Sequence, residues 1–281
     1  MKNTEKKILV LGSTGKTGSK VVQRLKQRGI SVRSGSRSVS PKFDWDDKTT
    51  WDACLKNIKS VYISFQPDLA VPGSVEAIEY FSQLAVKNGV EKLVLLSGRG
   101  EEEAEHCEQI VIHSGLKWTI VRASWFNQNF SEGFLLKPIQ QGEVILPAGN
   151  VAEPFVDTDD IADVAVAALT EEGHDGEIYE VTGPRSLTFN DAVAEISKAT
   201  GREITYQQIP VSDYAAALEE HKVPEDFIWF ITYLFTEVLD GRNTSLADGV
   251  QRALGREPKD FSEYARKTAA TQAWSEQRVA G

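Results

Sequence analysis

The sequence has few residues of the kinds that build disulfide frameworks or metal centres. Among its 281 residues there are only two cysteines, Cys54 and Cys107, which are too few for a disulfide framework and lack metal-ligand spacing. The four histidines are scattered along the chain, and no His-Glu-x-x-His pattern occurs. We therefore expect reduced thiols and no metal site.

Long apolar runs and an excess of positive charge are also missing. No stretch approaches the run of about 18 apolar residues that a transmembrane helix needs. The first residues, MKNTEKK, are polar and lead directly into an apolar segment, so we expect neither a signal peptide nor a membrane span, and a cytoplasmic location. A net charge of −10 is unlike the basic surface of a general nucleic-acid binder. We expect no membrane or nucleic-acid partner.

Two catalytic motifs are absent. A Walker A loop would need a glycine five positions before the glycine of Gly15-Lys16-Thr17, and Val10 stands there. The spacing thus argues against ATP or GTP. The Tyr-x-x-x-Lys pair of ordinary short-chain dehydrogenases occurs nowhere in the chain, and the helix expected over residues 101–113 has no tyrosine.

What is present is a strand, a glycine turn and a helix in succession. The apolar run Ile8–Leu11 precedes Gly12, Gly15 and Gly18, and helical periodicity follows from Val21. This G-x-x-G-x-x-G spacing is the short-chain dehydrogenase variant of the dinucleotide fingerprint, whose alternative is a purely structural turn. The helix N-terminus offers free amides to phosphates. We predict that the cofactor contacts Gly12, Thr14, Gly15, Lys16, Thr17 and Gly18.

The remaining pattern predicts an α/β protein with a Rossmann doubly wound parallel sheet. Apolar runs predict strands over 31–37, 60–64, 92–97, 117–122 and 177–181, with a further strand ending near Asp44. We expect residues 1–150, joined by strands and a helix near 155–182, to form mainly an NADP(H)-binding Rossmann domain. Residues 183–281 are expected to form mainly a smaller α/β substrate lobe.

The end of the second strand indicates the cofactor. An NAD enzyme would carry an acid there to bind the ribose hydroxyls, but this chain has Ser36, Arg37 and Ser38. Arg37 can pair with a 2′-phosphate, which favours NADP(H) over NAD(H). The alternative is that Arg33 and Arg37 are solvated ends of a strand.

Further cofactor contacts are predicted at the ends of the following strands. Asp44 could accept from the adenine amino group while Trp45 packs on the ring; alternatively, an Asp-rich turn caps a helix at Thr49 or Thr50. The other predicted contacts of the cofactor are Phe65, Gln66, Pro67 and Ser97.

An aromatic and amide cluster predicts the substrate pocket, with core packing as the alternative. The predicted pocket residues are Arg99, Trp125, Phe126, Asn129 and Phe155. The aromatic segment from Pro224 to Leu239 suits either a lid over a small substrate or the interface of a homodimer.

Several of these motifs together resemble the NmrA-like atypical short-chain dehydrogenases. They are the glycine triplet, the basic end of the second strand, and the segments Ser114–Arg122, Trp125–Phe130 and Asp157–Ala162. Within that group the chain looks most similar to the ergot-alkaloid reductases, the festuclavine and agroclavine dehydrogenases. The resemblance implies NADP(H) binding. Some members keep a lysine four residues before a glutamate, but four residues before Glu108 this chain has Ala104, so that lysine's role does not transfer.

The missing tyrosine shapes the expected reaction. A positioned general acid contributes about 10²–10⁴-fold, and an unactivated ketone would need one. An iminium ion needs only hydride, and a quinone gives a stabilised oxyanion. We therefore expect an NADPH-dependent oxidoreductase acting on a flat or cyclic imine, iminium, quinone or conjugated acceptor, with no catalytic side chain assigned. The alternative is a non-catalytic NADP(H)-sensing regulatory protein, and an epimerase or dehydratase comes third.

Overall fold

The computed structural model describes residues 7–275, which fall into two compact units. Unit 1 comprises residues 7–123, 158–181 and 248–256 of the described chain, and unit 2 comprises residues 124–157, 182–247 and 257–275. Each unit therefore takes its residues from three separate stretches of sequence.

Unit 1 is built on a six-stranded parallel sheet in the order β2-β1-β3-β4-β5-β8. The strands are β1 (Lys7–Leu11), β2 (Val32–Gly35), β3 (Ile58–Ile63), β4 (Lys92–Gly98), β5 (Lys117–Ala123) and β8 (Glu177–Val181). The chain order reverses between β1 and β3, where a doubly wound sheet forms its ligand crevice at the carboxyl ends of the strands. The predicted α/β Rossmann fold is confirmed.

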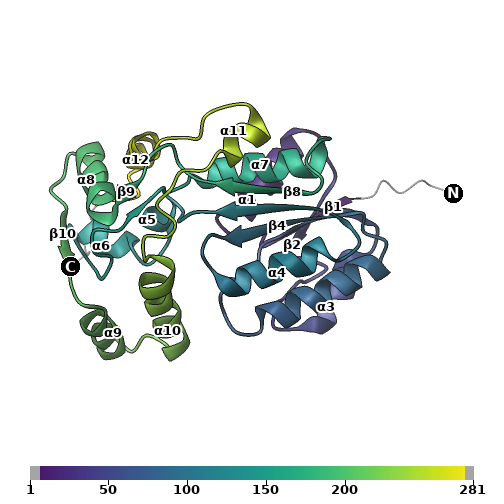
Figure 1. Cartoon of the computed structure of the whole chain (residues 1–281), viewed down its shortest axis with the longest axis horizontal. Helices are drawn as coiled ribbons and strands as arrows, with labels where there is room; N and C mark the ends of the chain where they lie inside the picture. Colours follow the sequence, from purple (N-terminus) through teal and green to yellow (C-terminus); the bar gives the residue numbers. More distant parts are fainter. Residues whose placement is uncertain (1–6, 276–281) are drawn as a thin grey trace. The chain divides into compact units, whose positions relative to one another are not determined.

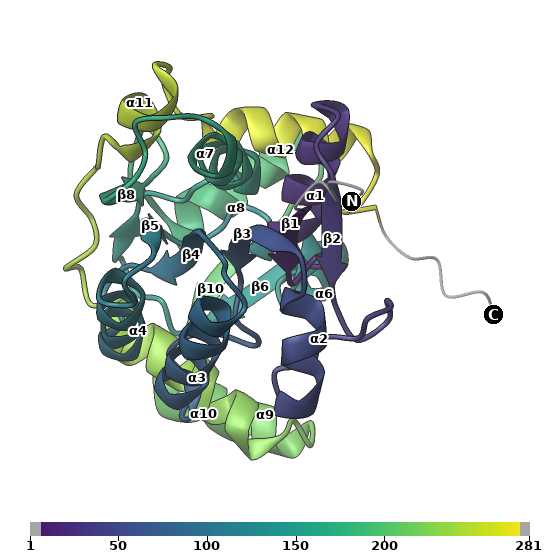
Figure 2. The same cartoon turned by 90° about the vertical axis from the view of Figure 1, so that its right-hand side faces the viewer.

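Helices cover both faces of this sheet. On one face α1 packs against α7, and on the other α3 packs against α4, as Figures 1 and 2 show. The helices of unit 1 are α1 (Gly18–Gln27), α2 (Trp51–Leu55), α3 (Ser74–Lys87), α4 (Glu102–Ile112), α7 (Thr158–Thr170) and α11 (Gly249–Leu254), with a 3₁₀ turn at Lys48–Thr50.

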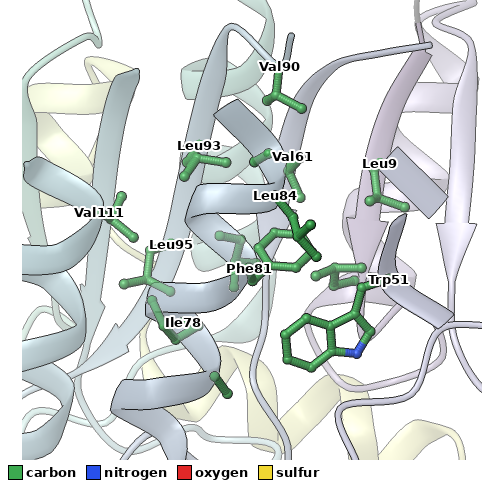
Figure 3. Packing of buried hydrophobic residues seen from close by; sticks show 14 of the residues in the cluster. Leu9, Trp51, Val61, Ile78, Phe81, Leu84, Val90, Leu93, Leu95 and Val111 are labelled. Carbon is green, nitrogen blue, oxygen red and sulfur yellow. The ribbon is translucent and has the colours of Figure 1, made fainter. Parts of the chain in front are cut away.

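A large apolar cluster fills the space between β1, β3 and β4 and helices α2 to α4. Leu9, Val61 and Leu93 from three strands meet Phe81 of α3 and Trp51 of α2 there (Figure 3). All five side chains are fully buried. Burying a large apolar side chain contributes about 1.5–3 kcal/mol, so this cluster fixes the sheet that positions the strand ends.

The strand predicted to end near Asp44 is absent, and β3 follows β2 directly in the sequence of strands. The Asp44 backbone hydrogen-bonds to side chains instead of a neighbouring strand: its N–H donates to Thr50 Oγ1 (3.1 Å) and its carbonyl accepts from Trp51 Nε1 (2.6 Å). The Asp-rich turn does cap a helix, because the Asp47 carboxylate accepts from the N–H of Thr49 (3.1 Å).

Unit 2 is helical with short strands. Its elements are α5 (Asn129–Glu132), α6 (Leu136–Gln141), β6 (Glu143–Leu146), β7 (Ala152–Glu153), β9 (Leu187–Thr188), α8 (Phe189–Thr200), β10 (Thr205–Gln208), α9 (Val211–Glu220), α10 (Glu225–Tyr233), a π-helical turn at Leu234–Val238 and α12 (Phe261–Ala270). Residues 124–150, which the sequence assigned mainly to the Rossmann domain, fall in this unit. The physical reason is that Phe130, Ile139 and Leu146 pack with Phe261 in one apolar core.

The segment from Pro224 to Leu239, which contains α10 and the π-helical turn, divides between core and surface. Ile231 and Phe235 are buried, whereas Phe227 and Trp229 are 39% and 46% exposed. Trp229 stacks on Tyr233 with ring centroids 5.6 Å apart. No helix within residues 7–275 combines the length and apolar character needed to cross a membrane.

Candidate functional site

The glycine loop between β1 and α1 depends on glycine at two of its three marked positions, Gly12 and Gly18. Gly12 has a left-handed φ of +63°, and the N–H of Gly15 donates to the Gly12 carbonyl (2.8 Å). A Cβ on Gly18 would lie 2.2 Å from the Gly12 oxygen. The turn is thus drawn tightly against the first turn of α1, which is the arrangement that lets backbone amides approach a pyrophosphate.

The start of α1 is electrostatically suited to an anion. The helix has ten residues and no acidic residue in its first turn, so the partial positive charge of its N-terminus is not offset there. Thr17, just before the helix, is buried and its Oγ1 accepts from the Tyr62 hydroxyl of β3 (3.0 Å). Burial raises the pKa of the Tyr62 phenol, and its hydrogen bond to Thr17 ties the loop to β3.

The end of β2 lies beside the glycine loop. The N–H of Ser13 donates to the Gly35 carbonyl (3.2 Å), and Ser36 Oγ lies 3.2 Å from Ser38 Oγ. Arg37 is exposed. Arg33 differs from Arg37, because its Nη1 donates to the carbonyls at positions 54 and 56 (2.8 and 2.7 Å) and so joins β2 to the end of α2.

Asp44 and Trp45 stand near the ends of β2 and β3. The Asp44 carboxylate lies 2.9 Å from the ammonium of Lys42, whose hydrogen bond is the main cause of a lowered pKa at Asp44. Trp45 is half-buried, donates through Nε1 to the Ser64 carbonyl (3.1 Å) and packs on Phe65 with ring centroids 4.8 Å apart. An apolar wall thus stands at the carboxyl end of β3.

The loop after β3 reaches toward the glycine loop. Gln66 and Pro67 are exposed, and Gln66 Nε2 lies 3.6 Å from where a Cβ on Gly15 would be. The predicted cofactor residues Gly15, which follows β1, and Gln66, which follows β3, therefore lie close together. Their contacts with a cofactor stay predictions.

The predicted cofactor residue Ser97 sits in a buried polar network. Its hydroxyl donates to Glu108 Oε1 (2.6 Å), and Arg122 Nε donates to the same carboxylate (2.9 Å). Arg122 also reaches Glu180 (2.9 Å), which lies 3.3 Å from Arg99 Nε. The network ties β4, α4, β5 and β8 together, and the side chains of Ser97 and Arg99 are both buried in it.

Sequence reasoning missed two carboxyl groups at the strand ends. Asp68 follows β3, Glu101 follows β4, and their side chains hydrogen-bond to each other. Burial, followed by the charge of Asp68, raises the pKa of Glu101 well above its ordinary value. The only signal in the sequence was their position shortly after two consecutive strands, which does not by itself show that they meet.

The other predicted substrate residues belong to unit 2. Trp125, Phe126 and Asn129 are half-buried, and Trp125 packs on Phe189 with ring centroids 5.3 Å apart. Phe155 is only 2% exposed and its ring packs edge-on against Phe130 and Phe189. Phe155 thus belongs to the apolar core, as the core-packing alternative had it. Substrate contacts by Trp125, Phe126, Asn129 and Phe155 stay predictions.

Comparison with known proteins gives consistent matches over nearly the whole chain. The NmrA-like family model matches residues 103–265, and an NAD(P)H-binding model matches residues 12–172. Prestalk A differentiation protein A of Dictyostelium discoideum is 29% identical over 95% of this chain and 93% of its own. Agroclavine dehydrogenase of Claviceps fusiformis is 30% identical over 92% of this chain and 95% of its own.

A solved structure shows the same fold. The crystal structure of an NADPH-dependent quinone oxidoreductase from Escherichia coli, complexed with NADPH, matches with a TM-score of 0.75 at 21% identity. The match covers 92% of this chain and 99% of the other.

Proposed function

This chain belongs to the NmrA-like family, and we propose that it is a reductase that transfers a hydride from NADPH to a flat or cyclic imine, iminium, quinone or conjugated acceptor. The match of residues 12–172 to an NAD(P)H-binding family model supports the choice of cofactor. Two of the proteins similar to this chain are an agroclavine dehydrogenase and an NADPH-dependent quinone oxidoreductase, and these names support an oxidoreductase activity.

The residues that would hold the cofactor fit a dinucleotide. The pyrophosphate would lie on the amides of the glycine loop, where the close approach of Gly18 to the Gly12 carbonyl leaves no room for side chains. Arg37, exposed at the end of β2, would pair with a 2′-phosphate. Residues 32–38 contain no acid that would favour an unphosphorylated ribose.

The adenine and nicotinamide ends follow from the same strand ends. Asp44 and Trp45 would meet the adenine, and the loop containing Phe65 and Gln66 would run along the nicotinamide ribose. Bound NADPH supplies the hydride. The protein supplies position and a water-poor aromatic surface, for which Trp125 and its neighbours are our proposed residues.

The observation that carries this proposal is the geometry of the glycine loop. A side chain at position 18 would clash with the Gly12 carbonyl, and no acidic residue in the first turn of α1 offsets the partial positive charge of the helix N-terminus. The test is the loss of NADPH absorbance at about 340 nm with a panel of cyclic imines, N-alkyl iminium ions and quinones. We expect turnover with at least one class of acceptor. No turnover across the panel, together with NADPH binding, would favour the NADP(H)-sensing alternative, which the lack of a Tyr-x-x-x-Lys pair also suits.

A further inference from the structure

Two carboxyl side chains stand at the ends of neighbouring strands in unit 1. Asp68 lies five residues beyond the last residue of β3 (Ile63), and Glu101 three beyond the last residue of β4 (Gly98). Because β3 and β4 are parallel and paired, both loops leave the sheet at its carboxyl edge. That edge is where a doubly wound sheet binds its ligand, and β3 borders the point where the strand order reverses.

The Glu101 side chain is packed against the end of β4. A Cβ on Gly98 would lie 2.4 Å from both carboxyl oxygens of Glu101, so the absence of a side chain at position 98 makes room for this group. Glu101 is 7% exposed, and its buried Oε2 has no hydrogen-bond partner among residues 7–275. A buried carboxylate oxygen without a donor is costly, and carrying a proton lowers that cost.

The two members of the pair differ in their surroundings. Asp68 is half-buried, and burial raises its pKa, although the backbone N–H of Ala70, which donates to Asp68 Oδ1 (3.0 Å), favours the charged form. For Glu101, burial and the charges of Asp68, Glu103 and Glu108 all raise its pKa. The proton therefore rests on Glu101 and is shared with Asp68.

We propose, building on the reductase function proposed above, that Asp68 and Glu101 form a proton-sharing pair that protonates the acceptor as hydride is added to it. Hydride adds to the acceptor carbon, and the oxygen or nitrogen that gains negative charge takes the proton through Asp68, the more exposed member. Both carboxyl groups are then ionised, and water returns a proton to the pair. Glu101 acts through Asp68 and is a positioning residue.

This pair replaces the tyrosine of other short-chain dehydrogenases in one respect only. It assists the reduction of acceptors that become negatively charged when hydride is added, such as quinones and neutral imines. An N-alkyl iminium ion, which becomes a neutral amine by hydride addition alone, gains nothing from it. The two classes of acceptor therefore separate the pair's contribution from every other effect of the site.

The experiment uses the full-length protein and the substitutions Asp68→Asn and Glu101→Gln. Glu102→Gln is the matched control, because Glu102 is exposed at the start of α4 and adjoins Glu101. Single-turnover NADPH oxidation is followed with a naphthoquinone and with an N-methylated cyclic iminium ion. Both pair variants should reduce the quinone about 10²-fold more slowly, while iminium reduction changes less than about threefold. The control should match the wild type with both acceptors.

A second readout needs neither cofactor nor turnover. At about one pH unit above the pKa of an ordinary glutamate, infrared spectra of the wild type should contain the C=O band of a protonated carboxyl group that Glu101→Gln removes and Glu102→Gln leaves. Equal slowing with both acceptors, or a wild-type protein without that band, would overturn the pair's role. A wild type that reduces neither acceptor would refute the proposed reductase function instead, and the infrared band would still decide whether the pair holds a proton.

Discussion

Gly18 lies so close to Gly12 that a methyl group on residue 18 would stand 2.2 Å from the Gly12 carbonyl oxygen. Gly18 is the first residue of α1, so any displacement that relieves this clash moves the start of the helix away from the loop. The proposed dinucleotide site and the position of α1 beside β1 therefore depend on the same missing side chain.

Gly18→Ala should lower both stability and cofactor affinity. Forcing a methyl group into this contact should cost about 1–3 kcal/mol of unfolding free energy. The displaced amides should also weaken NADPH binding. Denaturant unfolding and fluorescence titration with NADPH measure the two effects. Ser19→Ala, at an exposed position one residue later, is the control and should change neither; unchanged binding in Gly18→Ala would contradict the loop's role.

Arg37→Glu should change cofactor preference. If Arg37 pairs with the 2′-phosphate, its loss should weaken NADPH binding by about 10- to 150-fold. NADH binding should change little. Lys26→Glu makes the same charge change at an exposed position in the last turn of α1 and should leave the ratio of the two affinities unaltered. Equal losses for NADPH and NADH in Arg37→Glu would place the 2′-phosphate elsewhere.

Glu108→Ala should destabilise unit 1 through the network around Ser97. The substitution removes the carboxylate that accepts from the Ser97 hydroxyl and from Arg122 Nε. Arg122 then keeps its ion pair with Glu180 but lies beside the space that the glutamate side chain had filled. Breaking a buried ion pair costs about 3–5 kcal/mol. Urea unfolding measures the loss, and Glu105→Ala, on the exposed side of the same helix, should cost far less. Similar losses in the two variants would mean that the network contributes little.

The pH dependence of stability should reveal the raised pKa of Glu101. An unfolded glutamate loses its proton near pH 4.3, at about its unperturbed pKa, whereas the folded protein keeps the Glu101 proton to higher pH. The contribution of this group to stability is therefore greatest at low pH and is lost as pH rises through the folded-state pKa.

Relative to the wild type, Glu101→Gln should consequently gain stability as pH rises from about 4.5, at up to about 1.4 kcal/mol per pH unit. Denaturant unfolding at a series of pH values gives the difference. The curve for Glu102→Gln should run parallel to that of the wild type. A difference between Glu101→Gln and wild type that stays constant with pH would show that Glu101 titrates normally.

Local patterns were enough to predict the parts of the fold that depend on neighbours in sequence. The apolar run Ile8–Leu11 and the following glycines predicted β1, the turn and α1, because periodicity and turn chemistry are local properties. The strand expected near Asp44 was wrong, because the rings around it pack into the core and its backbone bonds go to Thr50 and Trp51.

Contacts between distant segments lay beyond such patterns. Nothing near Phe155 indicates that its ring would pack between aromatic residues from α5 and α8. Likewise, Asp68 and Glu101 meet because β3 and β4 are adjacent in the sheet, and the absence of a Tyr-x-x-x-Lys motif alone had suggested that no proton donor stood at the strand ends. A motif search finds residues at fixed spacing, whereas this pair is joined by topology.

The alternation of the chain between the two units also constrains how the protein can be made. The last stretch of unit 1 ends at Arg256, and α11 within it packs against β8 and α7. During synthesis, strands β1 to β5 and the glycine turn are translated early, but α11 of the same unit is translated only after most of unit 2. Neither unit corresponds to a continuous fragment of the chain, so no single truncation isolates one. Unit 1, which begins at the amino terminus, is complete only once α11 has been made.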